Sequence, residues 1–106
     1  VAERALVRQG YEVTSARDGE EGLGIVQDGA AFDLVISDVV MPAMDGPAMA
    51  REIRKLKPAL PVLFMSGYAE EQLRRDIDLV NMHFIPKPFT VQQLTDKVAA
   101  VLATAG

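Results

Sequence analysis

The sequence of 106 residues contains no cysteine and no tryptophan, and it has one histidine. The absence of cysteine excludes disulfides and thiolate metal sites. There is no run of basic residues, and 11 Lys and Arg against 15 Asp and Glu give a net charge of −4, so direct contact with nucleic acid is not expected. No hydrophobic run approaches the length of a membrane span, and no signal peptide opens the chain. We therefore expect a cytoplasmic domain that makes no contact of its own with a membrane.

Short hydrophobic runs alternate with amphipathic segments along the chain. The runs predict strands at residues 34–36, 61–65 and 82–85, and a weaker alternation predicts another at 11–16. Capping residues and helical periodicity predict helices at residues 1–9, 18–29, 46–57 and 70–79, and from Thr90 onward. Alternating strands and helices favour an α/β fold with a parallel sheet covered on both faces. The length suits one domain over residues 1–106.

Three of the predicted strands end in side chains that are chemically useful: Asp38, Ser66 and Lys87. The carboxyl ends of parallel strands lie at one edge of a sheet, so we expect these side chains to converge. A carboxylate can attack phosphorus and form an acyl phosphate. An ammonium group and a hydroxyl suit the oxygens of the phosphoryl group. The combination therefore predicts a site for phosphoryl transfer, which a divalent cation normally completes.

Each of these residues also has a simpler explanation. Asp38 and Ser66 could hydrogen-bond their own turns, and Lys87 could be a solvated charge between two prolines. Taken singly these explanations are favoured, but the shared position at successive strand ends favours the site. The Lys87–Pro88 peptide bond is in addition a candidate for the cis form.

Three stretches together resemble a known family: DLVISDVVMPAMDG at 33–46, PVLFMSG at 61–67 and FIPKPF at 84–89. They are similar to the receiver domain of two-component signalling systems, and the resemblance extends over the whole chain. The stretch VLFMSGYAEE at 62–71 resembles receivers of hybrid histidine kinases, especially the alphaproteobacterial cell-cycle kind. The parent protein of such a receiver can be anchored in a membrane.

The resemblance implies a role for each matching position. Asp38 is the expected phosphoacceptor, Ser66 the switch hydroxyl, and Lys87 the residue that contacts the phosphoryl group. The backbone carbonyl of Val40 is an expected Mg²⁺ ligand alongside Asp38, and Phe84 occupies the aromatic switch position. The implied fold is flavodoxin-like, with strand order 2-1-3-4-5. The implied partners are a histidine kinase, a histidine phosphotransferase, or both, and the domain is not an enzyme by itself.

The sequence departs from the family at its start. Receivers open with a strand that ends in an acidic pair, which holds Mg²⁺, and nothing in this chain matches it; Glu20 and Glu21 belong to a predicted helix. The missing strand is the middle of the sheet. We therefore expect an N-terminally incomplete domain, a gap of ~10 Å between the strands around Val13 and Ile36, and an incomplete metal site. A true truncation is expected to rearrange its strands, for example as a strand-exchanged dimer.

Two other functions use similar residues. A phosphohydrolase of the haloacid-dehalogenase type also has a strand-end Asp, a hydroxyl and a Lys, but it has a second acid where this chain has Val40. A pseudo-receiver keeps the fold as a docking module without phosphoryl transfer. The missing acidic pair favours a pseudo-receiver, whereas the intact Asp38, Ser66 and Lys87 favour phosphoryl transfer.

Overall fold

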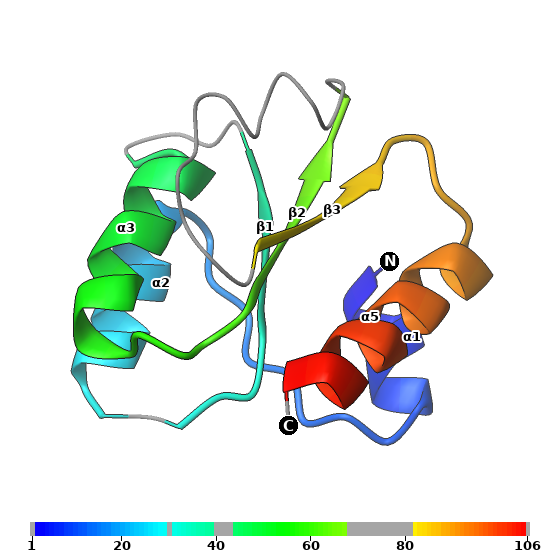
Figure 1. Cartoon of the computed structure of the whole chain (residues 1–106), viewed down its shortest axis with the longest axis horizontal. Helices are drawn as coiled ribbons and strands as arrows, with labels where there is room; N and C mark the ends of the chain where they lie inside the picture. The colour runs from blue at the N-terminus through cyan, green and yellow to red at the C-terminus, as the bar shows by residue number, and fades with distance from the viewer. Residues whose placement is uncertain (1, 30, 40–43, 68–81, 106) are drawn as a thin grey trace.

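A computed structural model describes residues 2–29, 31–39, 44–67 and 82–105 (Figure 1). The elements are α1 (Ala2–Arg8), α2 (Gly19–Gln27), β1 (Val35–Asp38), α3 (Gly46–Leu56), β2 (Val62–Ser66), β3 (Met82–Pro86) and α5 (Val91–Ala105). The helix predicted at residues 70–79 lies outside the described residues. In the described part of the chain, no helix has the length and apolar character needed to cross a bilayer.

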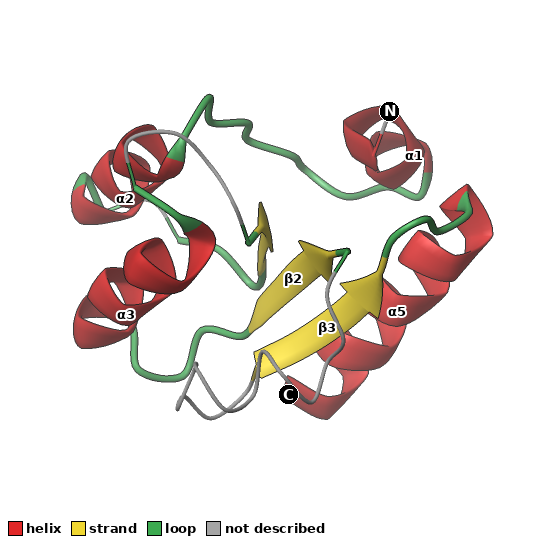
Figure 2. Cartoon of the chain, turned by 90° about the horizontal axis from the view of Figure 1, so that it is seen from above, coloured by secondary structure: helices red, strands yellow, loops and turns green. Residues whose placement is uncertain are grey.

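The strands form a parallel sheet in the order β1-β2-β3. Figure 2 shows α2 and α3 on one side of this sheet and α1 and α5 on the other. The prediction of a parallel sheet with helices on both faces is therefore confirmed. The order β1-β2-β3 agrees with the 3-4-5 part of the family order 2-1-3-4-5. The rest of that order stays an expectation for the family.

Alternating residues of β2 supply the hydrophobic core on both sides of the sheet. Val62 and Phe64 pack with Ala50 of α3, and all three are fully buried. Leu63 points to the opposite face, where it packs with Leu6 of α1 and Leu94 of α5. β2 is the central strand and is buried on both faces, which explains its continuous apolar sequence.

The helix starts follow the capping signals in the sequence. The Asp18 carboxylate accepts a hydrogen bond of 2.9 Å from the Glu21 amide at the start of α2. Asp45 does the same for α3, with 2.9 Å to the Ala48 amide. At α5 the capping box is reciprocal: the Gln93 amide donates to Thr90 Oγ1 at 3.0 Å, and the Thr90 amide donates to Gln93 Oε1 at 2.8 Å.

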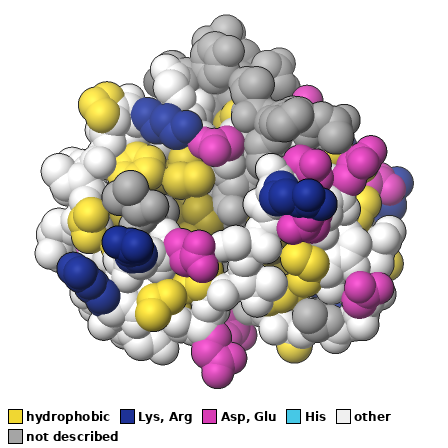
Figure 3. Space-filling view, turned by 180° about the vertical axis from the view of Figure 1, so that it is seen from behind, with side chains coloured by type: hydrophobic (Ala, Val, Ile, Leu, Met, Phe, Trp, Pro, Cys, Tyr) yellow, Lys and Arg dark blue, Asp and Glu magenta, His cyan; other side chains and the backbone are white. Residues whose placement is uncertain are grey.

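The strand predicted at residues 11–16 is wrong, because this segment has no regular secondary structure. A strand needs a neighbour to pair with, and no described strand lies beside this segment. A cleft of about 810 Å³ separates it from β1, with Val13 and Ile36 among its lining residues. Figure 3 shows hydrophobic side chains open to solvent on this rear face, among charged ones. The cleft lies where the sequence predicted a gap in the sheet.

Candidate functional site

The register of the sheet brings the predicted site residues to one edge. Asp38 pairs with Met65 across β1 and β2, and Ser66 pairs with Pro86 across β2 and β3. The next amide, that of Lys87, donates a hydrogen bond of 2.7 Å to the Ser66 carbonyl. All three site residues therefore lie at the carboxyl ends of neighbouring parallel strands, as their positions in the sequence predicted.

Lys87 contacts Asp38 directly, with 2.5 Å between Nζ and Oδ1. The two side chains are 47% and 42% exposed, so this ion pair contributes at most ~1 kcal/mol to stability. An ammonium group has three donors. One N–H can therefore hold the carboxylate while another binds an incoming anionic oxygen. The Lys87–Pro88 peptide bond is cis.

Two residues that the sequence did not single out fix the backbone of Asp38. The buried Ser37 hydroxyl donates a hydrogen bond of 2.7 Å to the Asp38 carbonyl. A Cβ at Gly46 would lie 2.3 Å from that same carbonyl oxygen, so only glycine fits there. The Gly46 amide in turn donates to the Val39 carbonyl at 2.9 Å. A small polar residue before the Asp and an Asp-Gly pair were the available signals for these roles.

The two predicted switch residues are buried beside the site. Ser66 is 3% exposed and Phe84 is 4% exposed. The Phe84 ring stacks on Phe64, with 5.9 Å between the ring centroids and 28° between their planes. Phe64 also reaches the site loop, because its ring edge would lie 2.9 Å from a Cβ at Gly46. The aromatic pair therefore joins Gly46, at the start of α3, to the middle of β3.

The described residues do not form a complete metal site. They contain no group of three or more His, Cys, Asp or Glu side chains that could hold an ion. The predicted Val40 carbonyl lies outside the described residues. Glu21 pairs with Arg17 at 2.7 Å, which also raises the pKa of Arg17 through that hydrogen bond and charge. In the part of the chain that the structure describes, Asp38 is the strand-end carboxylate that Mg²⁺ would use, and one carboxylate does not hold the ion alone.

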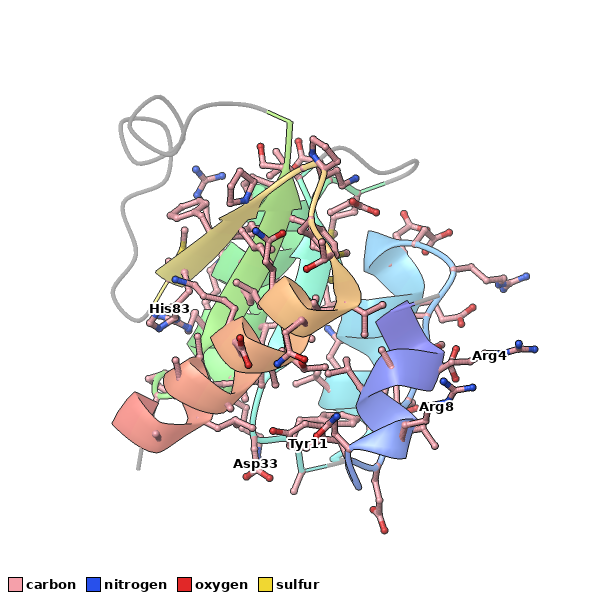
Figure 4. The ribbon with its side chains drawn as sticks, turned by 90° about the vertical axis from the view of Figure 1, so that its right-hand side faces the viewer. Arg4, Arg8, Tyr11, Asp33 and His83 are labelled. Carbon is pink, nitrogen blue, oxygen red and sulfur yellow. The ribbon has the colours of Figure 1, made fainter. Side chains whose placement is uncertain are left out.

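Other polar side chains lie away from this edge of the sheet. Figure 4 shows Arg4 and Arg8 projecting outward from α1, and His83 on the far side of the molecule on β3. No role was predicted for His83, and its position gives it none in the Asp38 site.

Comparison with known proteins agrees with the geometry. The family model described as the response regulator receiver domain matches residues 1–99. The chain belongs to the response regulator receiver family. A receiver domain is not by itself an enzyme, so a haloacid-dehalogenase-type hydrolase is set aside.

Two curated relatives come from Brucella abortus. The receiver domain is 45% identical over 101 residues to the sensor kinase CckA, covering 93% of this chain and 11% of that protein. It is 32% identical over 103 residues to the receiver protein CpdR, covering 96% of this chain and 85% of that protein. The chain therefore spans about a tenth of the first relative and most of the second.

Solved structures share the fold. A response regulator receiver protein from Sinorhizobium medicae superposes with a TM-score of 0.88 at 28% identity, covering 99% of this chain and 85% of that one. The receiver domain of the hybrid histidine kinase CckA gives 0.80 at 39% identity, covering 95% and 85%. The structural comparison thus includes the receiver of a hybrid histidine kinase, as the sequence predicted, and the sequence comparison includes a sensor kinase of the same name.

Proposed function

We propose that residues 1–106 form one receiver domain whose Asp38 accepts a phosphoryl group from a phosphohistidine. The observation that carries the proposal is the contact of 2.5 Å between Lys87 Nζ and Asp38 Oδ1 at the carboxyl ends of β3 and β1. A half-exposed carboxylate is accessible to a donor. The adjacent ammonium supplies the positive charge that phosphoryl oxygens need.

The proposed step is a displacement at phosphorus. A carboxylate oxygen of Asp38 attacks, a P–O bond forms, and the P–N bond to the donor histidine breaks. The electron pair of the broken bond stays on the imidazole nitrogen, which remains in the donor as neutral or protonated histidine. Lys87 keeps one N–H on the acyl phosphate and stabilises its new charge. Attack of water on phosphorus later returns the carboxylate and inorganic phosphate.

Ser66 and Phe84 are the proposed switch residues. Ser66 ends β2 beside Pro86 of β3, and its carbonyl accepts a hydrogen bond of 2.7 Å from the Lys87 amide. Its hydroxyl therefore belongs to the same sheet edge as Asp38 and Lys87. A phosphoryl group that recruits this hydroxyl changes the packing around it. Phe84 is buried against Phe64 and carries that change to β3. In this proposal, the charge added at Asp38 shifts the equilibrium between two arrangements of a loop and of a partner-binding helix face.

The proposed partners follow from the family and its relatives. A receiver accepts phosphoryl groups from a histidine kinase or a histidine phosphotransferase. The similarity to the receiver domain of the hybrid histidine kinase CckA favours a hybrid histidine kinase as the parent protein. We place the exchange in the cytoplasm, where such donors act. Mg²⁺ is the cofactor that the family implies. The described residues supply one carboxylate for it, so no step above uses the ion.

Intact-mass spectrometry of the 106-residue protein tests the phosphoacceptor. The protein is incubated with acetyl phosphate, in MgCl₂ and separately in EDTA. We expect a single phosphoryl adduct that is lost in Asp38→Ala and kept in Asp33→Ala, an exposed aspartate just before the same strand. An adduct that forms in MgCl₂ but not in EDTA would show that phosphorylation requires the cation.

A docking module without phosphoryl transfer is the second candidate, because the described residues hold no acidic cluster for a metal. Absence of an adduct in both MgCl₂ and EDTA would replace the phosphoacceptor function with this one. An adduct that persists in Asp38→Ala would move the acceptor to another residue.

A further inference from the structure

A close contact between α2 and the loop before α3 has no part in the function proposed above. Gly19, the first residue of α2, is buried. A Cβ at this position would lie 2.2 Å from the Met44 carbonyl oxygen and 3.0 Å from the Met44 Cβ. Its φ is outside the left-handed region, so glycine is needed here for space and not for backbone conformation.

Met44 stands in the segment that runs from Asp38 to α3. Its neighbour Asp45 caps α3 through the Ala48 amide at 2.9 Å. The Gly46 amide closes the loop on the Val39 carbonyl at 2.9 Å. The Met44 side chain packs on the buried cluster that α2 and α3 share. A displacement of Met44 therefore acts on the two residues that follow it, and through Gly46 on the backbone of Asp38.

We propose that Gly19 is a positioning residue for Asp38, because Met44, at the end of the segment that leads into α3, lies against the start of α2, where glycine has no side chain. This role rests on the proposed phosphoacceptor function for its chemical consequence. The effect of Gly19 on the position of Met44, Asp45 and Gly46 does not depend on phosphoryl transfer and can be tested without it. A methyl group at position 19 cannot share space with a carbonyl oxygen 2.2 Å away, so either the loop or the helix must move.

The same helix provides a matched control. Gly24 also lies in α2, and a Cβ there meets no atom within 4 Å. Gly24→Ala therefore makes the same chemical change without the contact. It is expected to leave the site unchanged and to stabilise the helix slightly, because alanine is the better helix former.

Hydrogen exchange of the backbone amides is the first measurement, because it needs no phosphoryl transfer. In Gly19→Ala we expect the Gly46 and Ala48 amides to exchange about tenfold faster, while the amides of β2 keep their protection. Gly24→Ala should show neither change. A purely structural role would instead lower protection throughout the molecule. Unchanged protection of Gly46 and Ala48, or an equal loss in β2, overturns the proposal.

The rate of Asp38 phosphorylation by acetyl phosphate is the second readout. At a temperature where both variants are folded, Gly19→Ala should react roughly 100-fold more slowly than Gly24→Ala, the scale expected for a displaced reacting group. If the unsubstituted protein forms no adduct, the proposed function fails and hydrogen exchange alone decides the role of Gly19. A normal rate in Gly19→Ala overturns the positioning role.

One measurement on the unsubstituted protein covers the case in which Gly19→Ala does not fold. The contact predicts nuclear Overhauser effects between the α-protons of Gly19 and the β-protons of Met44. Their presence, with none between Gly24 and the loop, supports the seating of the loop on α2. Their absence overturns it.

Discussion

At the scale of single residues, we expect the ion pair of Lys87 and Asp38 to matter more for the proposed phosphoryl transfer than for stability. Both side chains are more than two-fifths exposed, and exposed pairs contribute at most ~1 kcal/mol. We therefore expect the main effect of Lys87 to be on the binding of an anionic group beside the Asp38 carboxylate.

Lys87→Ala should separate these two effects. We expect a change in unfolding free energy within ~1 kcal/mol and a fall in the rate of phosphorylation by acetyl phosphate of roughly 100-fold. The control is Lys55→Ala, which removes another exposed ion pair, 2.7 Å from Glu52. Urea unfolding and intact-mass kinetics measure the two quantities. A phosphorylation rate equal to that of Lys55→Ala would remove Lys87 from the site.

Arg54 presents the opposite case, a charged residue that serves the fold. It is 8% exposed, and its Nε donates a hydrogen bond of 2.6 Å to the Leu60 carbonyl, which holds the turn between α3 and β2. Burial lowers the pKa of Arg54, because desolvation opposes its charge.

Arg54→Ala should lower the unfolding free energy by about 1–3 kcal/mol, since it leaves the Leu60 carbonyl without this donor. Lys55→Ala, one residue along the same helix and exposed, serves as the control. Urea denaturation measures both. Equal midpoints for the two variants would show that the hydrogen bond to Leu60 has no net effect.

The sequence was enough to place Asp38, Ser66 and Lys87 at the ends of neighbouring strands, because a strand end is a local feature and parallel strands end together. It did not indicate the contact of Gly19 with Met44. That contact joins residues far apart in the chain, and nothing in the local pattern distinguishes Gly19 from Gly24. Such a contact depends on how α2 packs against α3 and the residues just before it, and capping signals and helical periodicity do not specify that packing.

At the scale of elements, helix starts were predictable and one strand was not. The signals at Asp18, Asp45 and Thr90 are local hydrogen bonds, so they form wherever the helix does. The segment at residues 11–16 has a strand-like pattern but no adjacent strand in the described residues. A strand is defined by its partner, and its own sequence is a weak guide.

Thr90→Ala tests the cap of α5. Losing the hydroxyl that accepts from the Gln93 amide should cost about 1 kcal/mol of unfolding free energy. Thr14→Ala makes the same substitution in an exposed segment without regular structure and should change stability by less than about 0.5 kcal/mol. Thermal or urea unfolding compares the two. A larger effect at Thr14 would mean that the segment at residues 11–16 is better ordered than its lack of pairing suggests.

At the scale of the whole molecule, the main feature is the cleft beside β1, because it exposes apolar surface and a strand edge. It leaves the edge of β1 away from β2 without a partner strand in the described residues and opens about 810 Å³ between the two helical layers. Unpaired strand edges and open apolar surface favour association. The strand-exchanged dimer, which the sequence predicts for a true truncation, remains a prediction, and this cleft is where an exchanged strand would bind.

Sedimentation of the 106-residue protein over a range of concentrations tests that association. We expect a dimer to form as concentration rises, and thermal unfolding to shift upward with it. Val13→Lys places a charge in the cleft and should weaken the dimer, whereas Gln9→Lys adds the same charge at an exposed position that does not line it. A monomer at all concentrations, or equal effects of the two variants, would contradict association through the cleft.

The stacking of Phe64 on Phe84 also has an evolutionary consequence. One face of Phe64 packs on Phe84, at 5.9 Å between centroids, while its edge borders the space that Gly46 leaves open. A close-packed core conserves volume, so a change in ring size at one of these two aromatic positions requires a compensating change at the other. Among related receivers we therefore expect the side-chain sizes at the two positions to vary inversely, with a larger residue at the position of Phe84 in lineages that have a smaller one at the position of Phe64.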